Sequence, residues 1–219
     1  MSTYVLMKIL EKIPRSYDKG LWLVTRGKLE KVYDELTRHI KKGDIVLDLG
    51  CGTGALTLRA AKRGAKVKGI DVNPRMLDIA KSHLREAKLT ENVELYDMGV
   101  AELGSEEREK YDAVTSGLCF SELTENEFSY TMSQVKRILK PGGLLLVGDE
   151  VRPTNILKKL FTVILRIPLR IATYLLTQNT TRALQDLPGR IQSFGFLIES
   201  IKLNKRENFI ELVARKTKK

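Results

Sequence analysis

The stretch that decides the fold is VLDLGCGTG, residues 46–54, in which an apolar run meets three glycines at alternate positions. A helical pattern follows from Ala55 onward. A strand that ends in such a turn can present backbone N–H groups to a ligand, because glycine tolerates positive φ and has no Cβ in the way. The helix that follows adds the positive end of its dipole. The stretch therefore predicts a strand, a ligand-binding turn and a helix.

A second acidic segment narrows the kind of ligand. Residues 67–73 (VKGIDVN) read as a second strand that ends at Asp71, 21 residues after Gly50. At this spacing a carboxylate reaches the ribose hydroxyls of a nucleoside bound on the turn. Dinucleotide-binding enzymes use a similar turn, so the glycines alone do not identify the ligand.

Two motifs together carry a resemblance to a known family. DLGCGTG (48–54) and GIDVNP (69–74) resemble motif I and the following acidic motif of class I S-adenosylmethionine-dependent methyltransferases. The overall pattern is similar to the ubiquinone/menaquinone-biosynthesis type, which acts on small, often lipophilic acceptors. The resemblance covers residues 40–150 well and residues 184–215 weakly.

Three further segments resemble a narrower group. Residues 2–8, 98–103 and 116–123 are similar to the corrinoid-protein-associated methyltransferases of anaerobes. That similarity implies association with a corrinoid protein rather than a defined reaction.

The resemblance implies S-adenosylmethionine as cofactor and gives roles to the motif residues. The glycine turn would lie under the methionine and ribose parts, and Asp48 would favour the ammonium group directly or through water. Asp71 would accept from the ribose hydroxyls, with Val72 packing on the adenine. The sulfonium already activates the methyl group, so the protein's task is orientation and exclusion of water. The cofactor site expected on this basis comprises Asp48, Gly50, Cys51, Gly52, Gly54, Asp71, Val72, Met98, Gly99, Val100 and Ser116.

One departure from the family pattern concerns the adenine. Family members usually carry an Asp-Ala pair after the third strand, and the carboxylate of that pair faces the adenine amino group. Here the pair falls on Gly99 and Val100, so no carboxylate is available at Gly99. We expect backbone groups of residues 98–100, or the carboxylate of Asp97 or Glu102, to serve instead.

The segment after the fourth strand, SGLCFSE (116–122), bears on the chemistry. It lacks the Asn/Asp-Pro-Pro-aromatic motif of enzymes that methylate exocyclic amines of bases, and Cys119 lacks the Pro-Cys setting of cytosine-C5 enzymes. Cys119 therefore reads as a small buried apolar residue. Glu122 is a candidate catalytic base that lines the methyl-transfer pocket. The alternative is that Glu122 complements the dipole of the next helix.

A tyrosine near the N-terminus is the second catalytic candidate. Residues 14–20 (PRSYDKG) resemble the Tyr-Asp segment with which many small-molecule methyltransferases cap the cofactor. Tyr17 would then lie over the sulfonium methyl, or else would attach the N-terminal helix to the core. The two histidines, His39 and His83, have polar neighbours and are expected at the surface.

Strand and helix patterns alternate along the chain. Strands are expected over 45–49, 66–71, 93–97, 111–116 and 144–149, with helices over 20–40, 55–63, 74–88 and 124–139. This order predicts an α/β, doubly wound, Rossmann-like sheet that is mostly parallel and binds its ligand at the carboxyl ends of the strands. Near the end, Gly195-Phe196 followed by 197–203 and 208–214 reads as a closing helix and two strands, the last of the seven strands being antiparallel. The expected parts are an N-terminal helical cap (1–40), the cofactor-binding core (41–150), an amphipathic helical insertion (151–183) and the closing helix and strands (184–219).

The charge of the chain is unevenly distributed. The formal net charge is +11, and residues 151–219 hold 14 Lys and Arg against four acidic residues. Such asymmetry favours an anionic partner, although a solvated basic surface explains part of it. The two cysteines show no metal-type spacing and no disulfide framework, so we expect no metal site and a reducing cytoplasm. Residues 1–12 lack the apolar run and cleavage site of a signal peptide.

The insertion carries an unusually apolar helical pattern. Three interpretations of it remain open: a lid over the substrate site, a helix lying on an anionic membrane surface, or a dimerisation face. Four charges argue against a membrane span, and Pro168 is expected to kink the helix. Between 155 and 177 the polar side chains fall on one narrow arc: Asn155, Lys158, Lys159, Thr162, Arg166, Arg170, Thr173 and Thr177.

The sequence favours one function and leaves two others open. The favoured one is methyl transfer to a small, lipophilic or cofactor-like acceptor, by a monomer or dimer in the cytoplasm or at the membrane periphery. An RNA methyltransferase would use the basic last third, but the chain lacks a base-amine motif and aromatic-rich basic strands. A non-catalytic cofactor-binding partner protein would account for the missing carboxylate at Gly99.

Overall fold

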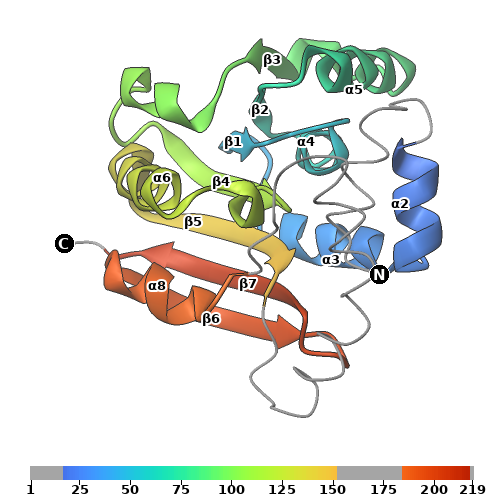
Figure 1. The fold of residues 1–219 in the computed structure, drawn as a ribbon. Coiled ribbons are helices and arrows are strands. Elements are labelled where there is room, and N and C mark those ends of the chain that lie inside the picture. Colours follow the sequence, from blue (N-terminus) through green and yellow to red (C-terminus); the bar gives the residue numbers. More distant parts are fainter. Residues whose placement is uncertain (1–16, 152–183, 218–219) are drawn as a thin grey trace.

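The computed structural model describes residues 17–151 and 184–217. Within these residues seven strands form one sheet (Figure 1). The strands are β1 (Ile45–Leu49), β2 (Lys66–Asp71), β3 (Val93–Asp97), β4 (Tyr111–Gly117), β5 (Leu139–Glu150), β6 (Phe196–Leu203) and β7 (Phe209–Lys216). Their order across the sheet is β3-β2-β1-β4-β5-β7-β6, and β7 alone runs antiparallel to its neighbours β5 and β6. The predicted fold class is confirmed.

Six helices and three short 3-10 turns connect the described strands. They are α2 (Tyr17–Thr25), α3 (Lys28–Thr37), α4 (Ala55–Lys62), α5 (Pro74–Glu86), η2 (Thr90–Asn92), η3 (Val100–Ser105), η4 (Phe120–Glu122), α6 (Glu125–Ile138) and α8 (Leu187–Ser193). Both long helices beside the cavity described below begin at identifiable caps. The Asn73 side chain accepts from the Arg75 N–H ahead of α5, and Thr124 and Glu127 form a reciprocal capping box at α6.

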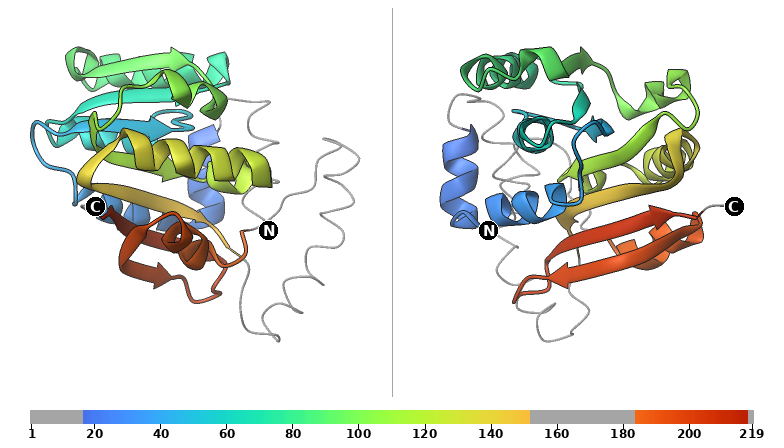
Figure 2. Two further views of the ribbon diagram at one scale, coloured as in Figure 1. Left: turned by 90° about the vertical axis from the view of Figure 1, so that its left-hand side faces the viewer. Right: turned by 180° about the vertical axis from the view of Figure 1, so that it is seen from behind.

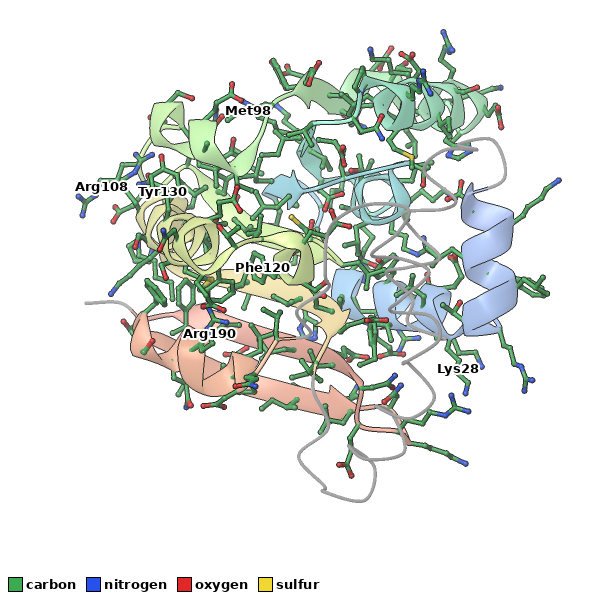
Figure 3. All side chains as sticks on the ribbon, in the orientation of Figure 1. Lys28, Met98, Arg108, Phe120, Tyr130 and Arg190 are labelled. Carbon is green, nitrogen blue, oxygen red and sulfur yellow. The ribbon has the colours of Figure 1, made fainter. Side chains whose placement is uncertain are left out.

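The sheet is covered on both faces, as Figure 2 shows from two sides. Leu47 and Leu49 of β1 belong to a core that includes apolar residues of α6 and α8, whereas Val46 faces a second core formed with α3 and α4. A parallel strand that is buried on both sides needs the near-continuous apolar run seen at 46–49. Arg190 of α8 lies 3.9 Å from the ring centroid of Phe128 on α6 and so joins two helices of the same face (Figure 3).

Two sequence expectations about element boundaries are wrong. The helix expected over 20–40 is two helices, because Arg26 and Gly27 adopt positive φ (53° and 67°) and interrupt the helical conformation. Strand β5 begins at Leu139 rather than 144. The turn-like sequence 140–143 lies inside it as an irregularity in the pairing between β4 and β5.

The insertion leaves and rejoins the described chain at one place. Val151 and Leu184 form a parallel bridge just past the carboxyl end of β5, and the Leu184 N–H donates to the Glu150 carbonyl over 3.3 Å. The amphipathic helix expected over 155–177, with its three interpretations, lies outside the described residues. Among the described helices none is long and apolar enough to cross a membrane.

Candidate functional site

The glycine turn after β1 has the conformation that its composition predicts. Gly50, Gly52 and Gly54 have φ of 62°, 52° and 86°, values that residues with a Cβ rarely adopt. A Cβ on Gly50 would lie 2.9 Å from the Cβ and Sγ of Cys119, so the loop after β4 approaches the turn closely. No atom lies within 4 Å of the corresponding position on Gly52, which faces open space.

Asp71, the last residue of β2, is joined directly to this turn. Its Oδ2 accepts the N–H of Gly52 and its Oδ1 accepts the N–H of Asn73, each over 2.8 Å. A carboxylate can accept about four hydrogen bonds, so these two orient the group without saturating it by themselves. The arrangement aims an acceptor at the space above the glycines.

That space is a cavity of about 620 Å³ at the carboxyl ends of the strands. Eight of the predicted site residues line it: Gly50, Gly52, Asp71, Val72, Met98, Gly99, Val100 and Glu122. The wall also contains residues that the sequence analysis left out: Ile70, Asn73, Pro74, Met76, Ala101, Gly117, Leu118, Cys119, Leu123 and Glu127. Figure 3 labels Met98, which comes from the connection after β3.

The end of the cavity beside β3 is apolar and shaped by backbone. Val72 is 71% exposed although it is apolar, and its Cγ1 lies 3.2 Å from where a Cβ on Gly99 would stand. The Glu102 Oε1 accepts the Gly99 N–H over 3.0 Å, so Glu102 reaches the position where the family carboxylate is missing. Asp97, the other expected substitute, has no such contact with Gly99, and both carboxylates are exposed and lie outside the cavity lining.

The opposite end is formed by the segment after β4. Leu118 has φ of 62°, a conformation that costs energy for a residue with a Cβ. Its N–H donates to the Gly148 carbonyl over 2.8 Å, which holds it there. Glu122 follows on η4 and is exposed to the cavity. Glu127 also lines the cavity, and hydrogen bonds from the Thr124 N–H and hydroxyl lower the pKa of its carboxyl.

The charge of the lining distinguishes between classes of ligand. Among the described lining residues there are three carboxylates, Asp71, Glu122 and Glu127, and no Lys, Arg or His. A carboxylate lining stabilises a cationic ligand and opposes a diphosphate. The described residues also hold no group of three or more His, Cys, Asp or Glu that could bind a metal ion.

Asp48 is placed differently from what the resemblance implies. It is 1% exposed and does not line the cavity. Its two oxygens accept the hydroxyls of Thr57 on α4, over 2.6 Å, and of Thr115 on β4, over 2.7 Å. Burial raises the pKa of its carboxyl to about 6. Asp48 thus lies under the turn rather than in the cavity wall, and its expected role toward the ammonium group, directly or through water, stays a prediction.

Three other predicted site residues also lie behind the wall. Cys51 is buried against Gly69 of β2, and burial raises the pKa of its thiol well above the usual range. Gly54 precedes α4, and a Cβ there would lie 2.9 Å from Leu58 Cδ1. Ser116 is fully buried, and its hydroxyl has no hydrogen-bond partner among the described residues.

The N-terminal contribution differs from the one expected. Tyr17 begins α2, but its side chain lies outside what the structure describes. The neighbouring Asp18 instead accepts the hydroxyl of Thr53, in the glycine turn, over 2.7 Å. His83 is partly exposed at the surface, and its Nδ1 also lies 3.0 Å from the Thr53 carbonyl oxygen, a contact that the sequence analysis did not predict.

Sequence reasoning also missed a buried acid at the end of β5. Asp149 accepts the N–H of Ser121, over 3.1 Å, and the N–H of Glu150, over 2.6 Å. Burial raises the pKa of its carboxyl to about 7. The sequence feature that could have indicated Asp149 is its position near the carboxyl end of β5. Through Ser121 it holds η4, the element that carries Glu122.

A family model for the methyltransferase domain matches residues 46–143, from the buried start of β1 into β5. This stretch is similar to a methyltransferase domain over somewhat less than half of the chain. It contains the glycine turn, Asp71 and every residue that lines the cavity.

The chain also has curated relatives of similar sequence. The chain is 28% identical over 151 residues to a demethylmenaquinone methyltransferase of Symbiobacterium thermophilum, covering 67% of this chain and 59% of the relative. It is 30% identical over 153 residues to a ubiquinone biosynthesis O-methyltransferase of Coxiella burnetii, covering 69% and 60%. The chain spans between half and three fifths of the length of the curated relatives it matches.

The fold is shared with solved structures. A 1,6-didemethyltoxoflavin-N1-methyltransferase of Burkholderia thailandensis, solved with its acceptor and S-adenosylhomocysteine, aligns with a TM-score of 0.67 at 17% identity. The alignment covers 98% of this chain and 88% of that one. At this identity the likeness concerns the fold.

Proposed function

We propose that this chain is an S-adenosylmethionine-dependent methyltransferase that acts on a small, lipophilic or cofactor-like acceptor. The observation that carries the proposal is the acidic cavity above the glycine turn. S-adenosylmethionine bears a sulfonium and an ammonium against one carboxylate, so it is a net cation. Dinucleotides bear a diphosphate, which this lining opposes. The negative charge of the cavity thus favours S-adenosylmethionine over a dinucleotide, although both kinds of ligand bind to such a turn.

The chain's own residues bind and orient in this scheme. Asp71 accepts from the ribose hydroxyls, and the bare backbone of Gly52 permits close approach. Val72 and Gly99 form an apolar wall for the adenine, with Glu102 beside its amino group. The cofactor itself supplies an activated methyl group, so catalysis needs alignment and exclusion of water. Glu122 orients the acceptor or removes its proton, because it lines the cavity at the end away from Val72.

The acceptor is proposed to be lipophilic for two reasons. Leu118 and Leu123 on either side of Glu122 in the sequence line the cavity, and Val100 and Ala101 after β3 add further apolar lining. Two relatives are named for menaquinone and ubiquinone biosynthesis, whose intermediates are of that kind. The link to a corrinoid protein remains part of the proposal, because the segments 98–103 and 116–123 that resemble that subfamily both contribute to the cavity wall.

An RNA substrate is not favoured by the described part of the basic last third. Four of its six Lys and Arg side chains form ion pairs with acidic residues: Arg190 with Glu125, Lys202 with Glu211, Arg215 with Glu199 and Lys216 with Glu109. Paired cations offer less to phosphates, since the existing pairs would first have to be broken. Membrane association through the insertion stays a proposal based on its sequence.

The proposal is tested by methyl transfer. Methyl-labelled S-adenosylmethionine is incubated with the protein and a panel of acceptors: demethylated quinols, simple phenols, small amines and bulk RNA. We expect label in a small-molecule acceptor and none with Asp71→Ala. Label in RNA would show that the acceptor is RNA rather than a small molecule. Binding of the cofactor with no transfer to any acceptor in the panel or to a corrinoid protein would favour a non-catalytic cofactor-binding partner.

A further inference from the structure

Thr53 is the centre of a contact set that the proposed chemistry does not use. It lies between Gly52 and Gly54 and is 4% exposed. Its hydroxyl donates to the Asp18 Oδ1 on α2 over 2.7 Å, and its carbonyl oxygen lies 3.0 Å from the His83 Nδ1 on α5. Helices α2 and α5, which are far apart in sequence, therefore both contact Thr53 in the turn.

The side chains of Asp18 and His83 also lie near each other. A carbonyl oxygen only accepts, so the His83 Nδ1 carries the hydrogen in this contact. The other ring nitrogen, Nε2, lies 3.8 Å from the Asp18 Oδ2, which is close but longer than a hydrogen bond. Asp18 and His83 thus lie near each other as well as contacting Thr53.

The turn needs such support. Three glycines at alternate positions with positive φ have many competing conformations, and holding one of them costs conformational entropy. On the cavity side the turn is fixed by the bond from the Gly52 N–H to Asp71. On the outer side the described contacts of the Thr53 side chain and carbonyl are those to Asp18 and His83.

We propose that Asp18 and His83 are positioning residues that hold the glycine turn in its ligand-binding conformation through Thr53. Helix α2, which stands beside α3 in Figure 1, thereby becomes part of the cofactor site without touching the cavity. Coupling between two sites is reciprocal, so a ligand that orders the turn also strengthens the docking of α2. The inference rests on the proposed function, because it takes the cofactor to be the ligand of the turn.

The test measures binding of S-adenosylhomocysteine by calorimetry. Asp18→Ala and Thr53→Val each remove the hydroxyl–carboxylate bond, and we expect five- to thirtyfold weaker binding. Asp18→Asn and Thr53→Ser keep an acceptor and a donor, so their affinities stay within threefold of the parent. The double variant Asp18→Ala/Thr53→Val binds no more weakly than the worse single variant, because both remove one interaction. Asp78→Ala, an exposed acid on α5, is the control and leaves affinity unchanged.

A second measurement does not depend on variants. Hydrogen exchange of the α2 amides in the unchanged protein becomes slower when S-adenosylhomocysteine is added. If the protein binds the ligand but neither α2 exchange nor the affinity of Asp18→Ala and Thr53→Val changes, the inference is overturned. If the unchanged protein binds neither S-adenosylmethionine nor its product, the proposed function fails instead.

Discussion

Gly117 and Gly148 are register partners at the carboxyl ends of β4 and β5, and the ring of Tyr33 on α3 packs against both. A Cβ on Gly117 would lie 2.6 Å from the Tyr33 hydroxyl oxygen, and one on Gly148 would lie 3.5 Å from the Tyr33 Cε1. The absence of side chains at this pair lets α3 approach the end of the sheet that carries the cavity. The helix thereby supports the segment that begins with Gly117.

Gly117→Ala should destabilise the protein by about 1–3 kcal/mol, because the new methyl overlaps the phenol. Gly148→Ala should cost less, since its nearest contacts are 3.3 Å away. Chemical denaturation measures both. Tyr33→Phe removes the oxygen that is closest to Gly117, so the loss caused by Gly117→Ala should shrink in that background. An unchanged loss there would contradict the packing described.

Glu122→Gln should lower kcat by about 10²-fold while leaving cofactor affinity nearly unchanged. The reason is that Glu122 lies on η4 after β4, whereas Asp71 ends β2 and Val72 follows it, and β1 lies between these two strands. Steady-state kinetics and calorimetry give the two quantities separately. Glu107→Gln, an exposed acid outside the cavity lining, serves as the matched control. Equal losses in rate and cofactor affinity would show that Glu122 supports the fold rather than the reaction.

Asp48 should make stability depend on pH. Burial raises the pKa of its carboxyl from 3.8 to about 6, so the folded state holds the proton more tightly than the unfolded state. The stabilisation is complete below the unfolded pKa and is lost as pH rises through about 6, a change of about 3 kcal/mol. Asp48→Asn keeps bonds to both threonine hydroxyls, which can donate or accept. We expect its unfolding free energy to vary less between pH 4 and 7 than that of the parent, and an unchanged pH profile would contradict this.

The strands of the site could be predicted from sequence because their signals are local. The apolar run at 46–49 and the segment 66–71 each end in a residue that the chain order places at the carboxyl edge of a parallel sheet. The glycine turn and Asp71 follow directly from that topology. Glu122 could be placed in the cavity wall for the same reason, because it follows the carboxyl end of the parallel strand β4.

What could not be predicted depends on tertiary placement. Asp48 lies in a strand that is buried on both faces, so apolar alternation does not reveal which way its side chain points. The contacts among Asp18, Thr53 and His83 join three elements, and no short-range pattern encodes them. Strand β5 extends back to Leu139 because Leu139 pairs with Tyr111 of β4, and the Lys216 Nζ of β7 also donates to the Leu139 carbonyl over 2.6 Å; the local sequence shows neither contact.

The most direct test of the account is calorimetric titration of S-adenosylmethionine into the parent protein and into Asp71→Ala. The parent should bind in the micromolar range. Removing the carboxylate takes away the acceptor for two hydroxyls and releases the Gly52 N–H, so affinity should fall by about 30-fold or more. Asp97→Ala, an exposed acid at the end of β3, should bind like the parent. Binding by Asp71→Ala that is as tight as that of the parent would contradict the assignment of this cavity to the cofactor.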